Sequence, residues 1–171
     1  EFTLFSSELL NKEEYIGEIN SFISNLPTGG FKVVSEENGN IPMSCYRFDL
    51  NNTKNIMHIG TAGGWTKPST GYTFQRINYK TKELVEFLKT KKPLIEFKNK
   101  NRFWFYDLLF IDVLAKDNSS GSDLFISMFK KNSPKTIFKF LDEKSNYFEE
   151  LNIMLSFKIG KFIKALINRI F

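Results

Sequence analysis

The chain has 171 residues, of which 42% are hydrophobic and 16% aromatic, and it carries a net charge of +5. This length suits one compact unit, and the basic charge favours anionic partners such as a membrane surface, a phosphate-bearing cofactor or nucleic acid. A single cysteine, Cys45, excludes an internal disulfide, and a single histidine, His58, argues against a metal cluster and against Ser-His-Asp or Cys-His catalysis. No metal site is predicted.

The ends of the chain lack targeting features. The first residues have no basic segment followed by an apolar one, and no apolar run reaches about 18 residues. We therefore expect neither a signal peptide nor a membrane span. The chain begins without methionine in an apolar segment, which suggests a fragment of a longer protein.

The first elements are predicted to be strands around one helix. Glu1–Phe5 alternates polar and apolar residues and predicts a strand. Asn11 and Glu14 form a capping-box pattern, and the apolar stripe of residues 16–26 predicts an amphipathic helix that ends at Pro27.

A hairpin is predicted next. Phe31–Glu36 and Ile41–Phe48 flank Asn38-Gly39, a pair typical of a tight hairpin turn. Pro42 cannot donate to a ladder, so the second strand would lie at an edge or carry a bulge. Ile56–Gly60 predicts a further short strand.

A glycine-rich loop follows that strand. Gly60, Gly63 and Gly64 allow the backbone to turn sharply and to approach a ligand, while Ser69 or Thr70 is predicted to cap the next helix. A strand, glycine loop and helix N-terminus in this order favours a phosphate or the edge of a polar ring. An ordinary strand-to-helix turn is the alternative.

The rest of the chain is predicted to be helical. Apolar positions in residues 74–88 form a helical stripe that stops at Pro93, and Arg102–Leu114 is apolar almost all round. Its aromatic residues could line a tunnel for an apolar ligand or form a core. Asp123–Lys130 predicts a short helix, and Ser133-Pro134 predicts the start of another.

The last segment, Lys158–Phe171, is predicted to be a basic amphipathic helix. Its apolar residues recur at helical spacing, and its lysines and arginine lie off that stripe. Such a helix suits the headgroup layer of a membrane, and packing of the stripe on the protein core is the alternative.

The amino-acid sequence of the glycine loop resembles a motif of a known family. Ile-Gly-Thr-Ala-Gly-Gly-x-x-Lys-Pro-Ser-Thr-Gly-Tyr-x-Phe, from Ile59 to Phe74, looks like the second flavin-binding motif of the FAD-dependent lycopene cyclases. Thr61 stands where many related flavoproteins have aspartate, as it often does in lycopene cyclases. The resemblance implies flavin contacts from Gly60, Thr61, Ala62, Gly63, Gly64, Pro68, Ser69, Thr70 and Gly71.

Two further segments resemble the same family. Glu1-Phe2-Thr3 is similar to its Phe-Leu-Glu-Glu-Thr motif, with Phe2 replacing the second acid, so the resemblance implies that Glu1 is the catalytic proton donor. Ile41, Pro42 and Met43 resemble a substrate-domain segment near the flavin, which implies that they bind substrate. Core packing is the alternative for this segment.

The predicted fold is α+β: a small mixed β-sheet followed by a helical C-terminal tail, as the C-terminal half of an FAD/NAD(P)-binding flavoprotein. Residues 1–58 would supply substrate-domain strands and a helix, residues 59–90 the flavin-contacting loop and helix, and residues 91–171 the tail. The N-terminal dinucleotide-binding half would be missing.

The implied function is carotenoid biosynthesis. Lycopene, or a related linear carotene, would be cyclised to β-ionone-ring carotenes by an intramolecular lyase or isomerase that uses reduced FAD, with NAD(P)H as electron donor. We expect a cytoplasmic, peripheral membrane protein whose fragment alone is inactive and which binds no nucleic acid. The alternatives are a flavin-dependent isoprenoid oxidoreductase and a non-catalytic basic peripheral-membrane module.

Overall fold

The computed structural model describes residues 2–27, 29–98 and 101–170, and its chain divides into two units, Glu1–Asn40 and Ile41–Phe171. The first unit contains helix α1, Lys12–Ser24. Asn11 accepts a hydrogen bond from the backbone of Glu14, and Glu14 accepts one from the backbone of Asn11, so the predicted capping box is confirmed. None of the residues of α1 is buried, and Phe22 remains 68% exposed.

The second unit begins with extended chain and short 3-10 turns, which are η1 (Phe48–Asn51) and η2 (Gly60–Gly63). Helix α2, Phe74–Lys89, and the turn η3, Leu94–Glu96, follow. Phe97 packs edge-on against Phe87 of α2 and lies 6.4 Å, between ring centroids, from Trp65. This aromatic group fixes α2 to the loop that precedes it.

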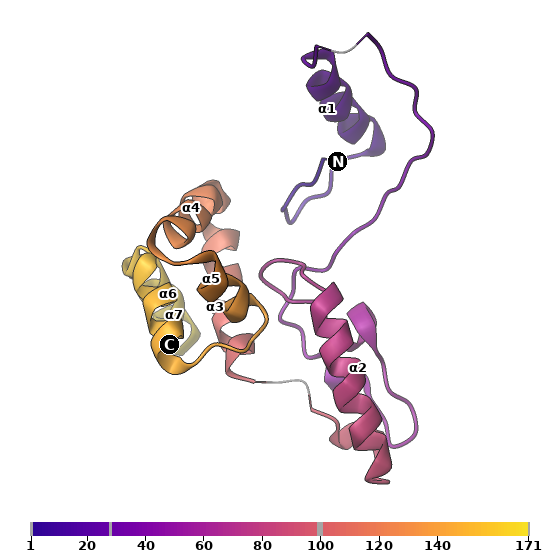
Figure 1. The fold of residues 1–171 in the computed structure, drawn as a ribbon, viewed down its shortest axis with the longest axis vertical. Helices are drawn as coiled ribbons and strands as arrows, with labels where there is room; N and C mark the ends of the chain where they lie inside the picture. Colours follow the sequence, from indigo (N-terminus) through magenta and orange to yellow (C-terminus); the bar gives the residue numbers. More distant parts are fainter. Residues whose placement is uncertain (1, 28, 99–100, 171) are drawn as a thin grey trace. The chain divides into compact units, whose positions relative to one another are not determined.

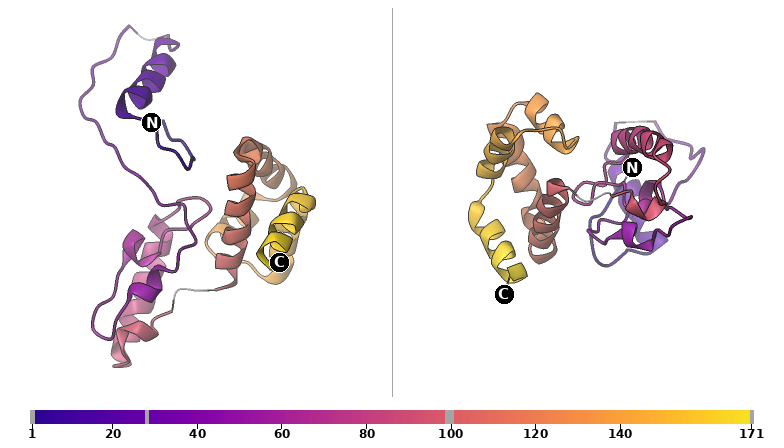
Figure 2. Two further views of the ribbon diagram at one scale, coloured as in Figure 1. Left: turned by 180° about the vertical axis from the view of Figure 1, so that it is seen from behind. Right: turned by 90° about the horizontal axis from the view of Figure 1, so that it is seen from below.

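The remaining helices form a bundle, which the salmon, orange and yellow ribbons trace in Figures 1 and 2. They are α3 (Arg102–Lys116), α4 (Gly121–Lys131), α5 (Pro134–Leu141), α6 (Tyr147–Ser156) and α7 (Ile159–Ile170), with η4 (Asn118–Ser120) between α3 and α4. Ser133 caps α5 with Pro134 at its first position, as predicted. Asn146 caps α6 through a capping box.

Apolar side chains from several helices meet in the bundle core. Met128, Ile137 and Ile153 are buried together, and Phe125, Phe140, Leu141 and Phe157 pack against them. Phe103 of α3 is 1% exposed and contacts the ring of Phe140. For Phe103 the structure therefore supports the core interpretation over a tunnel lining.

The predicted α+β fold with a mixed sheet is wrong. Within the described ranges the chain forms helices and turns and no β-strand. Neither segment predicted as part of a hairpin forms a strand, and Val34 and Ile41 are 91% and 61% exposed. An isolated strand pair is marginal without a third strand or a covering helix, which explains why a turn signal alone does not produce a sheet here.

No helix in the described part of the chain is long and apolar enough to cross a membrane. The described residues also contain no cluster of three or more potential metal-ligating side chains.

Candidate functional site

The glycine loop, residues 59–73, consists of two successive closed turns. The Trp65 amide donates to the Gly60 carbonyl at 2.9 Å, which closes the first turn. The Lys67 amide donates to the Tyr72 carbonyl, and the Gly71 amide donates to the Lys67 carbonyl, each at 2.9 Å, which closes the second. The backbone of the loop is therefore fixed largely by its own hydrogen bonds.

Three glycines of this loop adopt positive φ. The φ angles are +60° at Gly60, +72° at Gly64 and +69° at Gly71. A Cβ atom at Gly64 would lie 3.1 Å from the ring of Phe48, whereas a Cβ at Gly60 would meet only Ile77 Cδ1, at 4.0 Å. Gly60 therefore leaves open space beside the loop, and Gly64 packs against η1.

The predicted substrate segment lies against the loop. A Cβ at Gly71 would lie 3.3 Å from Ile41 Cγ2 and 3.4 Å from Met43 Sδ. Ile41 and its neighbour Pro42 are exposed, and Met43 is half-buried. The structure thus brings together two segments that the sequence places about 30 residues apart.

Gly63 is required by the loop itself. A Cβ at this residue would lie 2.2 Å from the carbonyl oxygen of His58, which belongs to the backbone that leads into the loop. The absence of a side chain at Gly63 therefore serves close packing between two backbone segments.

Helix α2 starts later than predicted. Neither Ser69 nor Thr70 caps it, because the N-cap position is Thr73 and the helix begins at Phe74. The Thr73 hydroxyl donates to the Gly71 carbonyl at 2.8 Å and makes no capping bond to the helix. The first-turn N–H groups of α2 thus have no side-chain cap.

A buried ion pair holds the second half of the loop. Lys67 Nζ lies 2.9 and 3.0 Å from the two carboxylate oxygens of Asp107 on α3, and the Ser69 hydroxyl donates to Asp107 Oδ1 at 2.5 Å. The Lys67 and Asp107 side chains are 1% and 4% exposed. Burial lowers the pKa of Lys67, and the neighbouring Asp107 carboxylate opposes that shift by attracting the charged ammonium.

A second pair of charges adjoins the first. Arg76 of α2 donates through Nε to the Trp65 carbonyl at 2.9 Å, and its Nη1 pairs with Glu143. Asn101 Nδ2 donates to the other oxygen of Glu143 at 2.6 Å, and Lys67 Nζ lies 3.7 Å from Glu143 Oε1. Two cations and two carboxylates therefore form one network, the loop anchor (Lys67, Asp107, Arg76 and Glu143), whose formal charges cancel.

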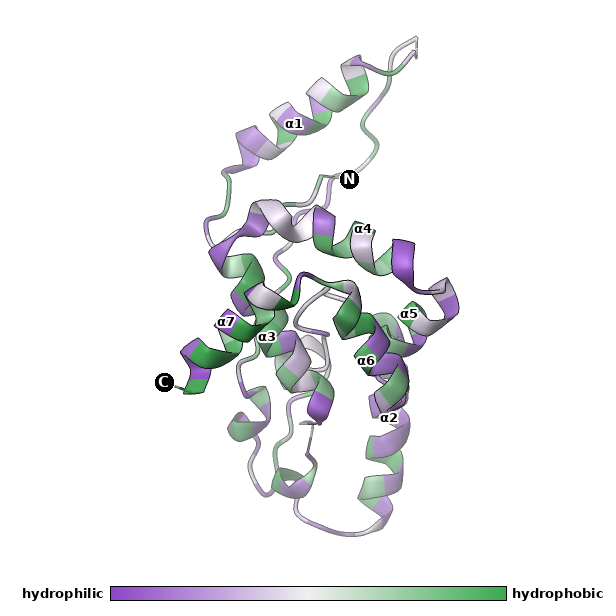
Figure 3. Cartoon of the chain, turned by 90° about the vertical axis from the view of Figure 1, so that its left-hand side faces the viewer, coloured by the Kyte–Doolittle hydropathy of each residue, from purple (hydrophilic) through white to green (hydrophobic). Residues whose placement is uncertain are grey.

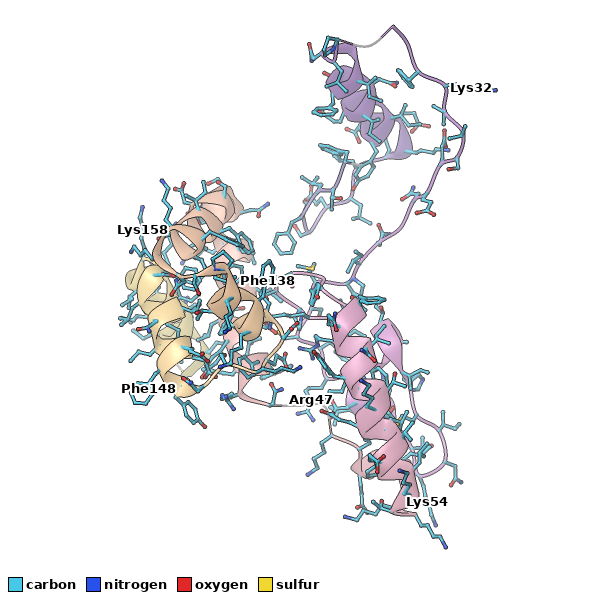
Figure 4. All side chains as sticks on the ribbon, viewed as in Figure 1. Lys32, Arg47, Lys54, Phe138, Phe148 and Lys158 are labelled. Atoms are coloured by element: carbon cyan, nitrogen blue, oxygen red, sulfur yellow. The ribbon has the colours of Figure 1, made fainter. Side chains whose placement is uncertain are left out.

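The cavity beside this network is too small for a cofactor. It has a volume of about 30 Å³ and is lined in part by Arg47, Gly63, Gly64, Trp104 and Glu143. Such a space holds one or two water molecules at most. Arg47, one of the lining residues, is labelled in Figure 4.

The predicted flavin-contacting residues divide into an exposed and a buried group. Thr61 and Ala62 are exposed, and Gly60, Gly64, Thr70 and Gly71 are half-buried, whereas Gly63, Pro68 and Ser69 are buried. A planar ring could approach the open side of Gly60 and the uncapped first turn of α2, where N–H groups suit an oxygen-rich or anionic edge. The residues on this accessible side are therefore compatible with a flavin. Glu1, the predicted acid, lies outside the described residues.

The loop anchor was not predicted from the sequence. Lys67 is part of the family-like motif, and Asp107 is one of two acids that interrupt an otherwise apolar helix. A carboxylate in an apolar helix needs a partner when it is buried, and this signal could have identified Asp107. It could not have identified Lys67 as the partner.

A separate buried carboxylate, Glu150 of α6, binds two residues of α3. Arg102 binds it through Nε and Nη2 at 3.0 and 2.7 Å, and Tyr106 donates to it at 3.0 Å. Burial alone would raise the pKa of Glu150, but the bonds from Arg102 and Tyr106 outweigh burial and lower it. This network joins α3 to α6 without touching the glycine loop.

The C-terminal helix α7 shows apolar and polar residues on different sides in Figure 3. Its Lys161 pairs with Asp117 at 2.6 Å and its Arg169 with Asp112 at 2.7 Å. The hydrogen bonds from Lys161 and Ser119 lower the pKa of Asp117 to about 2. Two of its cations thus bind α7 to α3 and to Asp117, the residue between α3 and η4.

The apolar stripe of α7 is shared between core and surface. The ring of Phe162 stacks on that of Phe157, and Ala165 is buried. A second row remains 43–65% exposed, namely Ile159, Ile163, Ile167 and Ile170. Packing on the core therefore accounts for only part of the predicted stripe.

Comparison with known proteins identifies one family. The model of the family described as "Lycopene cyclase protein" matches residues 1–168. No curated protein and no solved structure matches the chain.

Proposed function

Because the chain belongs to the lycopene cyclase family, we propose that the complete protein cyclises lycopene to β-ionone-ring carotenes by acid catalysis. The family match over residues 1–168 is the observation that carries this proposal. A carotenoid cyclase role follows from the family, and the catalytic acid, the flavin and the membrane surface are the further parts of the proposal.

The proposed reaction is an isomerisation. A carboxylic acid protonates the terminal double bond of the polyene, a new carbon–carbon bond closes the ring, and a proton leaves to restore a double bond. No hydrogen is gained or lost overall. Glu1 is the proposed donor, which requires surroundings that keep its carboxyl group protonated.

Reduced FAD, regenerated by NAD(P)H, would supply an electron-rich ring that stabilises the developing cation. The open side of Gly60 and the exposed Thr61 and Ala62 would contact that ring. Ile41 and Met43, which lie against Gly71, would offer the neighbouring polyene an apolar edge.

Expression of the full-length protein in cells that accumulate lycopene tests the function. We expect cyclic carotenes of the same mass as lycopene, separated by chromatography. A product that has lost hydrogen or gained oxygen would instead indicate a flavin-dependent isoprenoid oxidoreductase. Unchanged lycopene, with the protein still bound to membranes, would favour the non-catalytic module.

The role of Glu1 is tested in the same cells. Glu1→Gln keeps the shape of the side chain but removes the acid, so we expect ring formation to fall by at least ~10²-fold, as is typical of a lost general acid. Glu8→Gln, in the same segment, serves as the control and should retain the parent rate. Parent-like cyclisation by Glu1→Gln would exclude Glu1 as the donor.

We further propose that the protein is a cytoplasmic, peripheral membrane enzyme that reaches its apolar substrate through α7. The exposed isoleucine row of α7 would enter the headgroup layer, and Lys158 and Lys164 would face anionic lipid. Lys158 projects away from the bundle in Figure 4. Lys161 is excluded from this role because it pairs with Asp117.

Vesicles of anionic lipid test this proposal at low salt. Lys158→Glu together with Lys164→Glu should weaken binding several-fold or more, since each basic residue near the surface contributes roughly 1 kcal/mol. The control, Lys89→Glu with Lys92→Glu on and after α2, changes the net charge equally. Equal binding by both double variants would rule out α7 as the membrane contact.

A further inference from the structure

We propose that Asp107 is a positioning residue that sets the glycine loop on the helical bundle and thereby shapes the flavin side of the active site. The proposal rests on the proposed function for its flavin part. Its structural part rests on the loop anchor alone.

Asp107 binds two residues of one turn. Both carboxylate oxygens contact Lys67 Nζ, and one also accepts the Ser69 hydroxyl, so Pro68 between them is held as well. The backbone of Lys67 closes the turn, because its amide binds Tyr72 and its carbonyl binds Gly71. A shift of the Lys67 ammonium therefore displaces the turn that carries Gly71.

The other end of the loop is held by the same network. Arg76 donates to the Trp65 carbonyl and pairs with Glu143, and Glu143 lies within 3.7 Å of Lys67 Nζ. The segment from Trp65 to Ser69 is buried as a result, while Thr61 and Ala62 remain exposed. The anchor thus fixes the inner side of the loop and leaves its outer side accessible.

The surroundings of Lys67 restrict the ammonium to one place. Its Nζ lies 5.9 Å from the ring centroids of both Phe103 and Phe140, within the range of cation–π attraction. A charge among aromatic rings has few alternative partners, whereas an apolar side chain could pack in several ways. We therefore expect the buried pair to fix the register of the loop more than it adds to net stability.

Asp107→Asn in the full-length protein tests the inference, with Glu150→Gln as the matched control. Both variants neutralise a buried carboxylate that forms an ion pair. Asp107 of α3 binds Lys67 of the loop, whereas Glu150 of α6 binds Arg102 of α3 and does not contact the loop. Hydrogen exchange of the loop amides is the first measurement. We expect exchange in residues 60–71 to rise by about tenfold or more in Asp107→Asn and by less than about twofold in Glu150→Gln, the tenfold rise corresponding to about 1.4 kcal/mol of lost protection.

FAD affinity is the second measurement, made well below the melting temperature of each variant. We expect Asp107→Asn to weaken FAD binding by about tenfold and Glu150→Gln to leave it nearly unchanged. If the parent protein does not bind FAD, the flavin part of the proposed function fails, and hydrogen exchange still decides whether Asp107 positions the loop.

The double variant Lys67→Met with Asp107→Leu separates positioning from stability. Removing both charges should recover much of the stability lost in Asp107→Leu, since apolar replacements of a buried pair are often tolerated. We expect rapid loop exchange and weak FAD binding to persist. Parent-like exchange in this double variant, or equal exchange in Asp107→Asn and Glu150→Gln, would overturn the inference.

Discussion

Replacing Lys67 with methionine is expected to lower the free energy of unfolding by about 3–5 kcal/mol, because the carboxylate of Asp107 would stay buried without its ammonium. Methionine has nearly the same length as lysine, so little packing is lost. Unfolding of the full-length protein in urea, followed by circular dichroism, measures the change through the transition midpoint.

Lys89→Met is the matched control for this experiment. Lys89 also forms an ion pair, with Glu86 at 2.6 Å, but both side chains are more than 60% exposed. Such a helical surface pair contributes about 0.3–0.5 kcal/mol. If Lys67→Met shifted the midpoint no more than Lys89→Met, the pair with Asp107 would have no special energetic role.

Gly63→Ala is expected to destabilise the protein by about 3 kcal/mol, the upper end of the usual range for overpacking. Its Cβ would lie 2.2 Å from the His58 carbonyl oxygen, so backbone rather than a flexible side chain must move. Gly160→Ala is the control, because no atom lies within 4 Å of its Cβ position. Thermal unfolding of the two variants measures the difference, and equal melting temperatures would contradict the close approach.

This contact also changes how flavin binding should be tested. A flavin lost from a Gly63 variant would reflect a distorted loop as much as a blocked ligand. Gly60→Ala is more informative, because the new Cβ meets only Ile77 Cδ1, at an ordinary contact distance of 4.0 Å. Its left-handed backbone costs about 1–2 kcal/mol. Weaker FAD binding by a folded Gly60→Ala protein would support an approach of the ring to this side.

The helices of this protein were largely predictable because their signals are local. Asn11 with Glu14, and Ser133 with Pro134, specify helix starts within four residues, and the structure confirms both. The sheet was not predictable in the same way. The apolar residues of 31–36 beside the Asn38-Gly39 turn indicate a strand, but a strand also needs a partner, and no short-range pattern shows whether one is present.

The candidate site was predictable in its parts. Residues 59–74 were predicted to contact flavin, and Ile41–Met43 were separately predicted to bind substrate. The structure places Ile41 and Met43 against Gly71. The pairing of Lys67 with Asp107 spans 40 residues. It depends on how α3 packs against the loop, which residue types and spacing alone do not determine.

The ion pairs of this protein differ in their sensitivity to salt according to how deeply they are buried. Exposed pairs are screened within about 8 Å at physiological ionic strength, whereas a pair enclosed by protein is screened far less. Lys161 with Asp117 and Arg169 with Asp112 are partly exposed, while Lys67 with Asp107 is almost fully enclosed. Rising ionic strength would therefore loosen the attachment of the C-terminal helix α7. The glycine loop would keep its place on α3 under the same change in salt.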